Sequence, residues 1–152
     1  YTKKKLKISP TTTTNNLNLQ TSITLYSEVI DLRKIKKNNF VGYGASYIAD
    51  TDTIIATIPI GYADGVPKKI KHVVINNKKY SVVGDICMDM LSVKVDDTVK
   101  LGDKVILVGG DKLPVKTVAN ECGINSYTLF TGITTRVPRV YKIEDDYVEI
   151  KY

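Results

Sequence analysis

Short runs of β-branched and aromatic residues, separated by turn residues at close spacing, make up most of the chain after residue 19. Thr53–Pro59 and Lys104–Val108 are typical runs, and Asn76-Asn77 and Gly109-Gly110-Asp111 are typical turns. Such runs favour extended backbone, while Gly, Asn and Asp tolerate the tight turns that join neighbouring strands. The runs do not alternate with long helical segments, which argues against a parallel sheet. The pattern therefore predicts a mainly β domain that is closed or nearly closed, as a β-barrel or a sandwich.

The expected strands share this composition and are bounded by polar or glycine-containing turns. They are Ile23–Leu32, Asp31–Asn39, Ser46–Ala49, Thr53–Pro59, His72–Ile75, Lys79–Val83, Met90–Val95, Lys104–Val108, Thr135–Lys142 and Tyr147–Tyr152. Two short helices are expected in addition. Pro114–Asn120 begins with proline and closes near Gly123, and Ser126–Thr131 follows it.

The chain has 152 residues, of which 43% are hydrophobic and 25% charged, with a mean hydropathy of −0.09. This composition is typical of one soluble globular domain. Residues 1–18 are polar and rich in Thr and Asn, so we expect an arm or linker there and the folded domain at residues 19–152. No apolar run approaches the roughly 18 residues that a membrane-spanning helix needs. Because the chain starts with Tyr1 instead of Met, we expect it to be a piece of a longer protein.

Lys and Arg outnumber Asp and Glu by 22 to 16, which gives a net charge of +6. Many of the lysines lie at the N-terminus or in apparent turns, which favours a solubilising role over a nucleic-acid surface. A basic β-barrel that binds single-stranded nucleic acid stays open as an alternative of a different class. The two cysteines, Cys87 and Cys122, are too few for a disulfide framework and predict reduced thiols in the cytoplasm.

Two glycine-containing segments present tyrosines. In Gly42-Tyr43-Gly44 the tyrosine lies between glycines in what would otherwise be strand, where glycine is expected if the backbone bends or another molecule approaches closely. In Ile58–Pro67 the strand stops and a loop punctuated by glycines presents Tyr62 and Asp64. Loops held by a rigid scaffold often carry binding groups. A β-bulge with a packing tyrosine and an ordinary turn are the structural alternatives.

The segment Val83–Met90 is an apolar strand interrupted by two carboxylates. Asp85 and Asp89 are four residues apart, so an extended chain directs both to one side. A like-charged pair can bind a metal ion or share a proton. Without a histidine cluster or an Asp-rich loop the pair is weak evidence, and we expect no metal site.

The order of these segments is more specific than any one of them. Gly42-Tyr43-Gly44 comes first, Pro59–Pro67 reads Pro-Ile-Gly-Tyr-Ala-Asp-Gly-Val-Pro, and Val83–Asp89 reads Val-Gly-x-x-Cys-Met-Asp. Arg136–Tyr141, near the C-terminus, reads Arg-Val-Pro-Arg-Val-Tyr. In this order the segments resemble the C-terminal β-domain of bacterial alanine racemases, and the resemblance extends from about Ile8 to the end of the chain.

The resemblance implies an enzyme that depends on pyridoxal phosphate (PLP) and interconverts L- and D-alanine. In that family an N-terminal (β/α)8 barrel, which this sequence does not contain, carries the lysine that holds the cofactor and acts as one of two bases. Tyr43 occupies the position of the second base, which the C-terminal domain supplies to the active site of the partner subunit. The implied partners are therefore alanine, the barrel and a second subunit, with no nucleic acid and no membrane. The chain alone is expected to be inactive.

The resemblance also implies contacts with the substrate. Tyr62 matches a tyrosine that lines the substrate entry, the backbone amide of Met88 matches the donor to the substrate carboxylate, and Asp89 is the neighbour that orders it. Thr135 stands where some members have a tyrosine that touches the cofactor phosphate and narrows the pocket. A racemase for serine or for a broad range of amino acids is therefore the alternative within the enzymes. A dimerisation domain with no chemistry of its own is the structural alternative.

Overall fold

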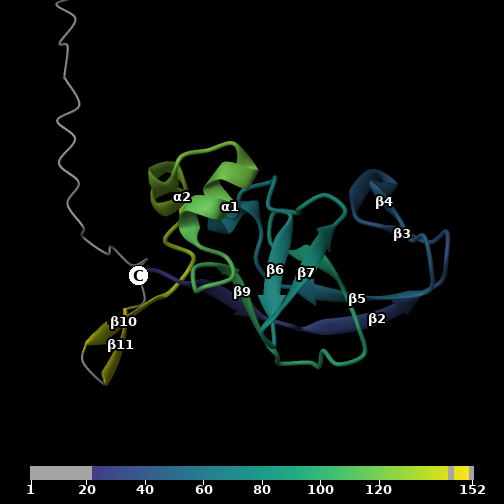
Figure 1. The fold of residues 1–152 in the computed structure, drawn as a ribbon, viewed down its shortest axis with the longest axis horizontal. Coiled ribbons are helices and arrows are strands. Elements are labelled where there is room, and N and C mark those ends of the chain that lie inside the picture. The colour runs from purple at the N-terminus through teal and green to yellow at the C-terminus, as the bar shows by residue number, and fades with distance from the viewer. Residues whose placement is uncertain (1–21, 144–145, 151–152) are drawn as a thin grey trace, which may run out of the picture.

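The computed structural model describes residues 22–143 and 146–150. The expected arm at residues 1–18 and the expected start of the domain at residue 19 lie outside these residues. The centre of the domain is one antiparallel sheet of seven strands (Figure 1), which pair in the order β1-β9-β6-β7-β8-β5-β2. Its strands are β1 (Leu25–Glu28), β2 (Asp31–Ile35), β5 (Thr53–Ile58), β6 (His72–Ile75), β7 (Lys78–Val83), β8 (Leu91–Val95) and β9 (Lys104–Val108).

The two edge strands of this sheet are consecutive parts of one segment. β1 pairs with β9, and β2 pairs with β5 at the other edge. Between them, the Val29 N–H donates to the Asp103 carbonyl and the Ile30 N–H donates to the Thr57 carbonyl, both at 3.0 Å. The sheet therefore curls round until a single segment contacts both of its sides, which leaves little unpaired edge. This confirms the predicted mainly β, barrel-like architecture.

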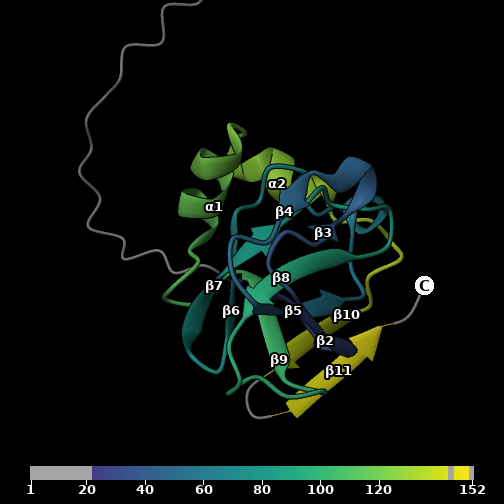
Figure 2. The same ribbon diagram turned by 90° about the vertical axis from the view of Figure 1, so that its right-hand side faces the viewer.

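The remaining elements lie around the sheet. They are β3 (Phe40–Val41), the 3₁₀ turn η1 (Tyr43–Ala45), β4 (Tyr47–Ile48), the 3₁₀ turn η2 (Tyr62–Asp64), α1 (Val115–Cys122), α2 (Ser126–Gly132), β10 (Arg139–Ile143) and β11 (Asp146–Ile150). Helices α1 and α2 lie at the top in both Figure 1 and Figure 2, and the hairpin β10–β11 lies at the bottom. The small β3–β4 hairpin lies apart from the helices along the long axis of the molecule (Figure 1).

The sheet and the helices share one apolar core. Leu91, Val93 and Val95 on β8 are buried, and the residues between them are only partly buried, which is the period of a strand with one face inward. In α1 the buried positions are Val115, Val118, Ala119 and Cys122, the spacing of one helical face. All of these residues belong to the same buried cluster, so α1 closes one end of the curled sheet.

The two predicted helices are confirmed, and their ends follow from local chemistry. α1 ends at Gly123, whose positive φ of 70° allows its N–H to reach the carbonyls of Ala119 and Asn120. At the start of α2 the side chain of Asn125 accepts a hydrogen bond from the Thr128 N–H at 2.7 Å. None of the helices in the described part of the chain is long and apolar enough to span a membrane.

Two strand predictions near the motifs are wrong. The strand expected from Thr135 begins only at Arg139, because residues 133–138 form a turn in which the Val137 N–H donates to the Thr134 carbonyl. The apolar run Val83–Met90 is not extended, since β7 ends at Val83 and β8 begins at Leu91. The intervening residues form a loop that contacts the other motifs.

The connection after β8 contains a polar cluster around Asp96. The carboxylate of Asp96 pairs with the Lys78 ammonium and accepts hydrogen bonds from the Tyr80 hydroxyl at 3.0 Å and from the Thr98 N–H at 3.1 Å. The hydrogen bond from Lys78 is the main cause that holds the pKa of Asp96 far below its ordinary value, and Thr98 and Tyr80 act in the same direction. The cluster therefore ties the β7 strand to the turn that follows β8.

This pKa shift predicts a loss of stability in acid. Because the folded pKa of Asp96 lies below the unfolded value of about 3.9, its contribution is present above about pH 4 and decreases as the pH falls toward the folded value. We expect Asp96→Asn to lower the unfolding temperature of the chain at pH 6, and the difference from the original chain to narrow below about pH 4. Thermal unfolding followed by circular dichroism measures both. The matched control is Asp111→Asn in an exposed turn, and a difference for Asp96→Asn that is the same at every pH contradicts the prediction.

Candidate functional site

Four segments that are far apart in the sequence meet through backbone contacts. They are the loop 42–46 between β3 and β4, the loop 61–65 after β5, the loop 84–90 between β7 and β8, and the turn 133–138 before β10. Both tyrosine-bearing loops rest on the backbone of the loop 84–90. We call these four segments the motif cluster.

The loop 42–46 holds Tyr43 in a tight 3₁₀ turn. Gly42 and Gly44 have φ values of 82° and 63°, a conformation that side chains disfavour, so both glycines of the motif are required by the backbone. A Cβ on Gly42 would lie 3.2 Å from the Asp85 nitrogen, which shows how closely this loop packs on the next one. The Asp85 N–H also donates to the Ser46 hydroxyl at 2.9 Å. Tyr43 itself is 76% exposed, so the loop is anchored while its tyrosine is free to contact another molecule.

The loop 61–65 holds Tyr62 against the middle of the loop 84–90. The Tyr62 N–H donates to the Cys87 carbonyl at 3.1 Å, and the Ala63 N–H donates to the Met88 carbonyl at 3.0 Å. The Lys68 ammonium lies 4.2 Å from the centroid of the Tyr62 ring, within the range of a cation–π interaction. Tyr62 is 38% exposed. The two tyrosines are therefore attached to different parts of the same loop, Tyr43 to its start and Tyr62 to its middle.

Met88 lies at the exposed tip of the loop 84–90. Its side chain is half exposed, and the turn is closed by a hydrogen bond of 2.9 Å from the Cys87 N–H to the Met90 carbonyl. Within residues 22–143 and 146–150 the Met88 N–H has no hydrogen-bond acceptor. A backbone donor of this kind suits a carboxylate, because a charge-assisted hydrogen bond is stronger than a neutral one.

Arg136 joins the turn 133–138 to two other loops of the cluster. Its Nε lies 3.2 Å from Oδ1 of the buried Asp64, and its terminal nitrogen pairs with the Asp89 carboxylate. The other oxygen of Asp64 accepts a hydrogen bond of 2.8 Å from the Gly61 N–H. The hydrogen bond to Asp89 and the charge of Asp64 raise the pKa of Arg136 above its ordinary value. Asp64 and Asp89, on different loops, therefore share one cation.

The described residues contain no group of three or more His, Cys, Asp or Glu side chains that could hold a metal ion. In the loop 84–90 the carboxylate of Asp89 is used differently from a metal ligand. Asp89 pairs with Arg136, and the backbone of Asp85 bonds to Ser46. This arrangement supports a site built from tyrosines and backbone donors.

A family model described as "Alanine racemase, C-terminal domain" matches residues 22–141. The chain belongs to this family. An alanine racemase of Lactiplantibacillus plantarum is 37% identical over 128 residues, which is 81% of this chain and 34% of the relative. Among solved structures, the alanine racemase of Bacillus anthracis with bound L-Ala-P superposes with a TM-score of 0.80 at 32% identity, over 85% of this chain and 35% of that one.

A third relative carries a cofactor. The alanine racemase of Bartonella henselae, solved with covalently bound pyridoxal phosphate, superposes with a TM-score of 0.68 at 30% identity, over 72% of this chain and 32% of that one. This alanine racemase C-terminal domain thus spans about a third of the length of the relatives it matches. Most of each relative corresponds to sequence outside this chain.

Thr135 lies in the turn 133–138, at the edge of the motif cluster, and is exposed. Its neighbour Thr134 fixes the turn to the loop 61–65, because its N–H donates to the Asp64 carbonyl at 3.2 Å and its hydroxyl donates to the Ala63 carbonyl at 2.9 Å. Arg139 stabilises the same turn by donating to the carbonyls of Ile133 and Thr134. Thr135 is therefore held in place by its neighbours while it remains exposed.

Sequence reasoning did not identify three features of the cluster in this alanine racemase domain. Ala45 adopts a positive φ of 52° immediately after the Gly-Tyr-Gly motif, and nothing in its residue type indicates this. The contact of Lys68 with the Tyr62 ring had a usable signal, since the two residues lie close together in one loop region. No signal in the sequence indicated the bridge of Arg136 to two carboxylates, because both carboxylates are distant from it in sequence.

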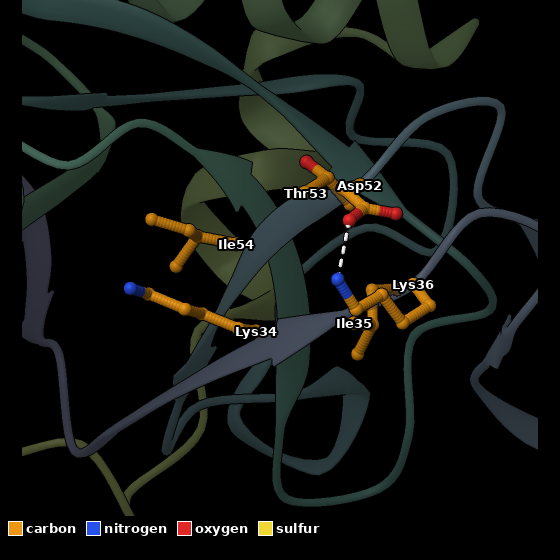
Figure 3. A pocket seen from close by; sticks show the side chains of 6 residues that line it. All are labelled: Lys34, Ile35, Lys36, Asp52, Thr53 and Ile54. Atoms are coloured by element: carbon orange, nitrogen blue, oxygen red, sulfur yellow. Dashed lines mark hydrogen bonds and ion pairs between the residues drawn. The ribbon is translucent and has the colours of Figure 1, made fainter.

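Two pockets of the domain lie outside the motif cluster. One lies where the end of β2 meets the start of β5, and there the Lys36 ammonium donates to Asp52 at 2.7 Å (Figure 3). The other lies beside β1 and includes Tyr26, Pro59 and Lys104. Neither contains a residue of the predicted site. The side chains of Tyr43 and Met88 in the motif cluster are exposed, so a second protein surface must cover them if water is to be excluded from a substrate.

Proposed function

We propose that this domain forms one side of the active site of a PLP-dependent alanine racemase, which interconverts L- and D-alanine. The observation that carries the proposal is Tyr43, an exposed phenol held on a glycine-fixed turn that is anchored to the loop of Met88. The exposed side chains of Tyr43 and Met88 support completion of the site by another part of the enzyme. That part is the N-terminal (β/α)8 barrel, which in a homodimer belongs to the partner subunit.

Racemisation requires two groups that reach Cα from opposite faces, one to remove a proton and one to return it. Tyr43 serves as the group on one face, and a lysine of the barrel serves as the group on the other. A free phenol has a pKa of about 10, so it becomes an effective base near neutral pH only beside a cation. The barrel supplies that cation when the two surfaces meet.

The other site residues bind and orient the substrate. The Met88 N–H donates to the substrate carboxylate, Asp89 orders the loop that carries this N–H, and Tyr62 lines the entry. The open hydrogen-bonding capacity of Met88 and the partial exposure of Tyr62 support these roles. Together they bind an amino acid by its acid group while leaving Cα free to face Tyr43.

The described residues fit an edge contact with PLP and not a complete binding site. Thr135 is an exposed hydroxyl at the edge of the cluster and would contact the cofactor phosphate, while the barrel holds the rest. Bound PLP supplies an electron sink that stabilises negative charge on Cα.

Cys87 and Cys122 are both free thiols, which supports a reducing compartment such as the cytoplasm.

Exchange of the Cα proton for deuterium tests the activity directly. The full-length protein that contains this domain is incubated with PLP and with L-alanine or L-serine in deuterated buffer, beside the present chain alone. We expect exchange and racemisation of alanine by the full-length protein and none by the chain alone. A preference for serine would assign a role in substrate choice to Thr135, which replaces the pocket-narrowing tyrosine of some family members. Absence of exchange with both amino acids would overturn the proposed function.

A further inference from the structure

The loops of Tyr62 and Met88 are joined by one charged side chain as well as by backbone hydrogen bonds. Arg136 contacts Asp64, the last residue of the η2 turn that begins with Tyr62, and Asp89, the residue after Met88. We propose that Arg136 is a positioning residue that fixes the Met88 N–H relative to Tyr62. This inference rests on the proposed function, because it concerns how the same site binds its substrate.

The burial of Asp64 explains why a cation is needed at this place. Asp64 is 8% exposed, and one of its oxygens is already occupied by the Gly61 N–H, which closes the η2 turn. A buried carboxylate is costly unless it is paired and hydrogen-bonded. Arg136 satisfies its second oxygen, so the shape of the Tyr62 loop depends on the arginine.

The contact of Arg136 with Asp89, at the other end of the bridge from Asp64, is exposed. This explains why loss of the bridge affects substrate binding. The side chains of Arg136 and Asp89 are 51% and 53% exposed, so their contact lies at the surface, next to the half-exposed Met88. The backbone bonds from Tyr62 and Ala63 hold the middle of the loop 84–90, through the carbonyls of Cys87 and Met88. The Arg136–Asp89 pair restrains the next residue of the loop, Asp89, at the surface.

An arginine suits this bridge for geometric reasons. Its planar guanidinium presents several donors in a fixed fork, so Nε and a terminal nitrogen bind two carboxylates at once. A lysine has the same charge, but its single ammonium has no such fork. Arg136→Lys should therefore retain a contact with Asp64 and release Asp89.

The kinetics of the full-length enzyme with L-alanine test this role. A looser Met88 N–H weakens binding of the substrate carboxylate equally in the ground state and the transition state, which raises KM and leaves kcat nearly unchanged. We expect Asp89→Asn and Arg136→Lys each to raise KM about 10-fold or more, since small misplacements of binding groups have effects of this order. Asp89→Asn breaks the bridge without leaving the buried Asp64 unpaired. Arg136→Met should give at least the same rise in KM together with a lower unfolding temperature.

A double variant and a matched control complete the test. If the bridge is the cause, Asp89→Asn adds no further rise in KM to Arg136→Met, because both remove one interaction. Arg33→Met removes a similar exposed ion pair, with Asp31 on β2, and should leave KM unchanged. The proposal is overturned if the cluster variants match Arg33→Met in KM, or if they lower kcat alone. Inactivity of the unmodified enzyme would instead overturn the proposed function.

Discussion

The variant Tyr43→Phe of the full-length enzyme is expected to lose exchange of the Cα proton of one alanine enantiomer by about 10²–10⁴-fold, the range for removal of a positioned acid–base group. Exchange of the other enantiomer should continue, because the lysine of the barrel acts on the opposite face. Phenylalanine keeps the ring and removes only the hydroxyl, and the ring is 76% exposed in this domain. The fold of the domain should therefore be unchanged. Mass spectrometry of deuterium uptake, started from each enantiomer separately, measures the two faces independently.

Tyr127→Phe is the matched control for this variant. Tyr127 is 79% exposed, on α2 and outside the motif cluster, so loss of its hydroxyl should change exchange from neither enantiomer. Equal loss of exchange from both enantiomers by Tyr43→Phe would assign the tyrosine to binding and not to one face. Full exchange in both directions would remove Tyr43 from the mechanism.

The second large effect is expected from Gly61→Ala. A Cβ on Gly61 would lie 2.3 Å from the carbonyl oxygens of both Cys87 and Met88. The φ of Gly61 is −142°, an extended value open to any residue, so the whole cost comes from this contact. Both neighbours are backbone atoms that cannot rotate away, and the two loops must separate. We expect the free energy of unfolding to fall by about 3 kcal/mol, the upper part of the usual range for overpacking. We also expect the proposed racemase activity of the full-length enzyme to be mostly lost.

Denaturant unfolding of the chain and racemisation by the full-length enzyme measure these two losses. Gly132→Ala at the end of α2 is the control, because the nearest atom to its added Cβ is 4.0 Å away, an ordinary contact. It should be close to neutral in both measurements. If Gly61→Ala also proves neutral, neither stability nor activity needs the close packing of the loops 61–65 and 84–90. The two loops would then not act as one site.

The local features of the fold could be predicted from the sequence. Alternating burial in β8 and the single apolar face of α1 follow from side-chain periodicity, which depends only on neighbouring residues. The glycines beside Tyr43 indicated an irregular turn for the same reason. The run Val83–Met90 was predicted wrongly because apolar composition favours a strand, while contacts with the loops 42–46 and 61–65 hold it as a loop.

The sequence by itself determined the mainly β class, the two helices, and the order of motifs that marks the family. Only the tertiary structure decided that one segment, β1–β2, contacts both sides of the sheet, and that the loops bearing Tyr43 and Tyr62 both rest on the Met88 loop. It alone also decided that Arg136 bridges Asp64 and Asp89. The physical reason is the distance along the chain over which each kind of interaction acts. Backbone preferences and periodicity act over a few residues, whereas these contacts join residues that the chain brings together only when the sheet curls.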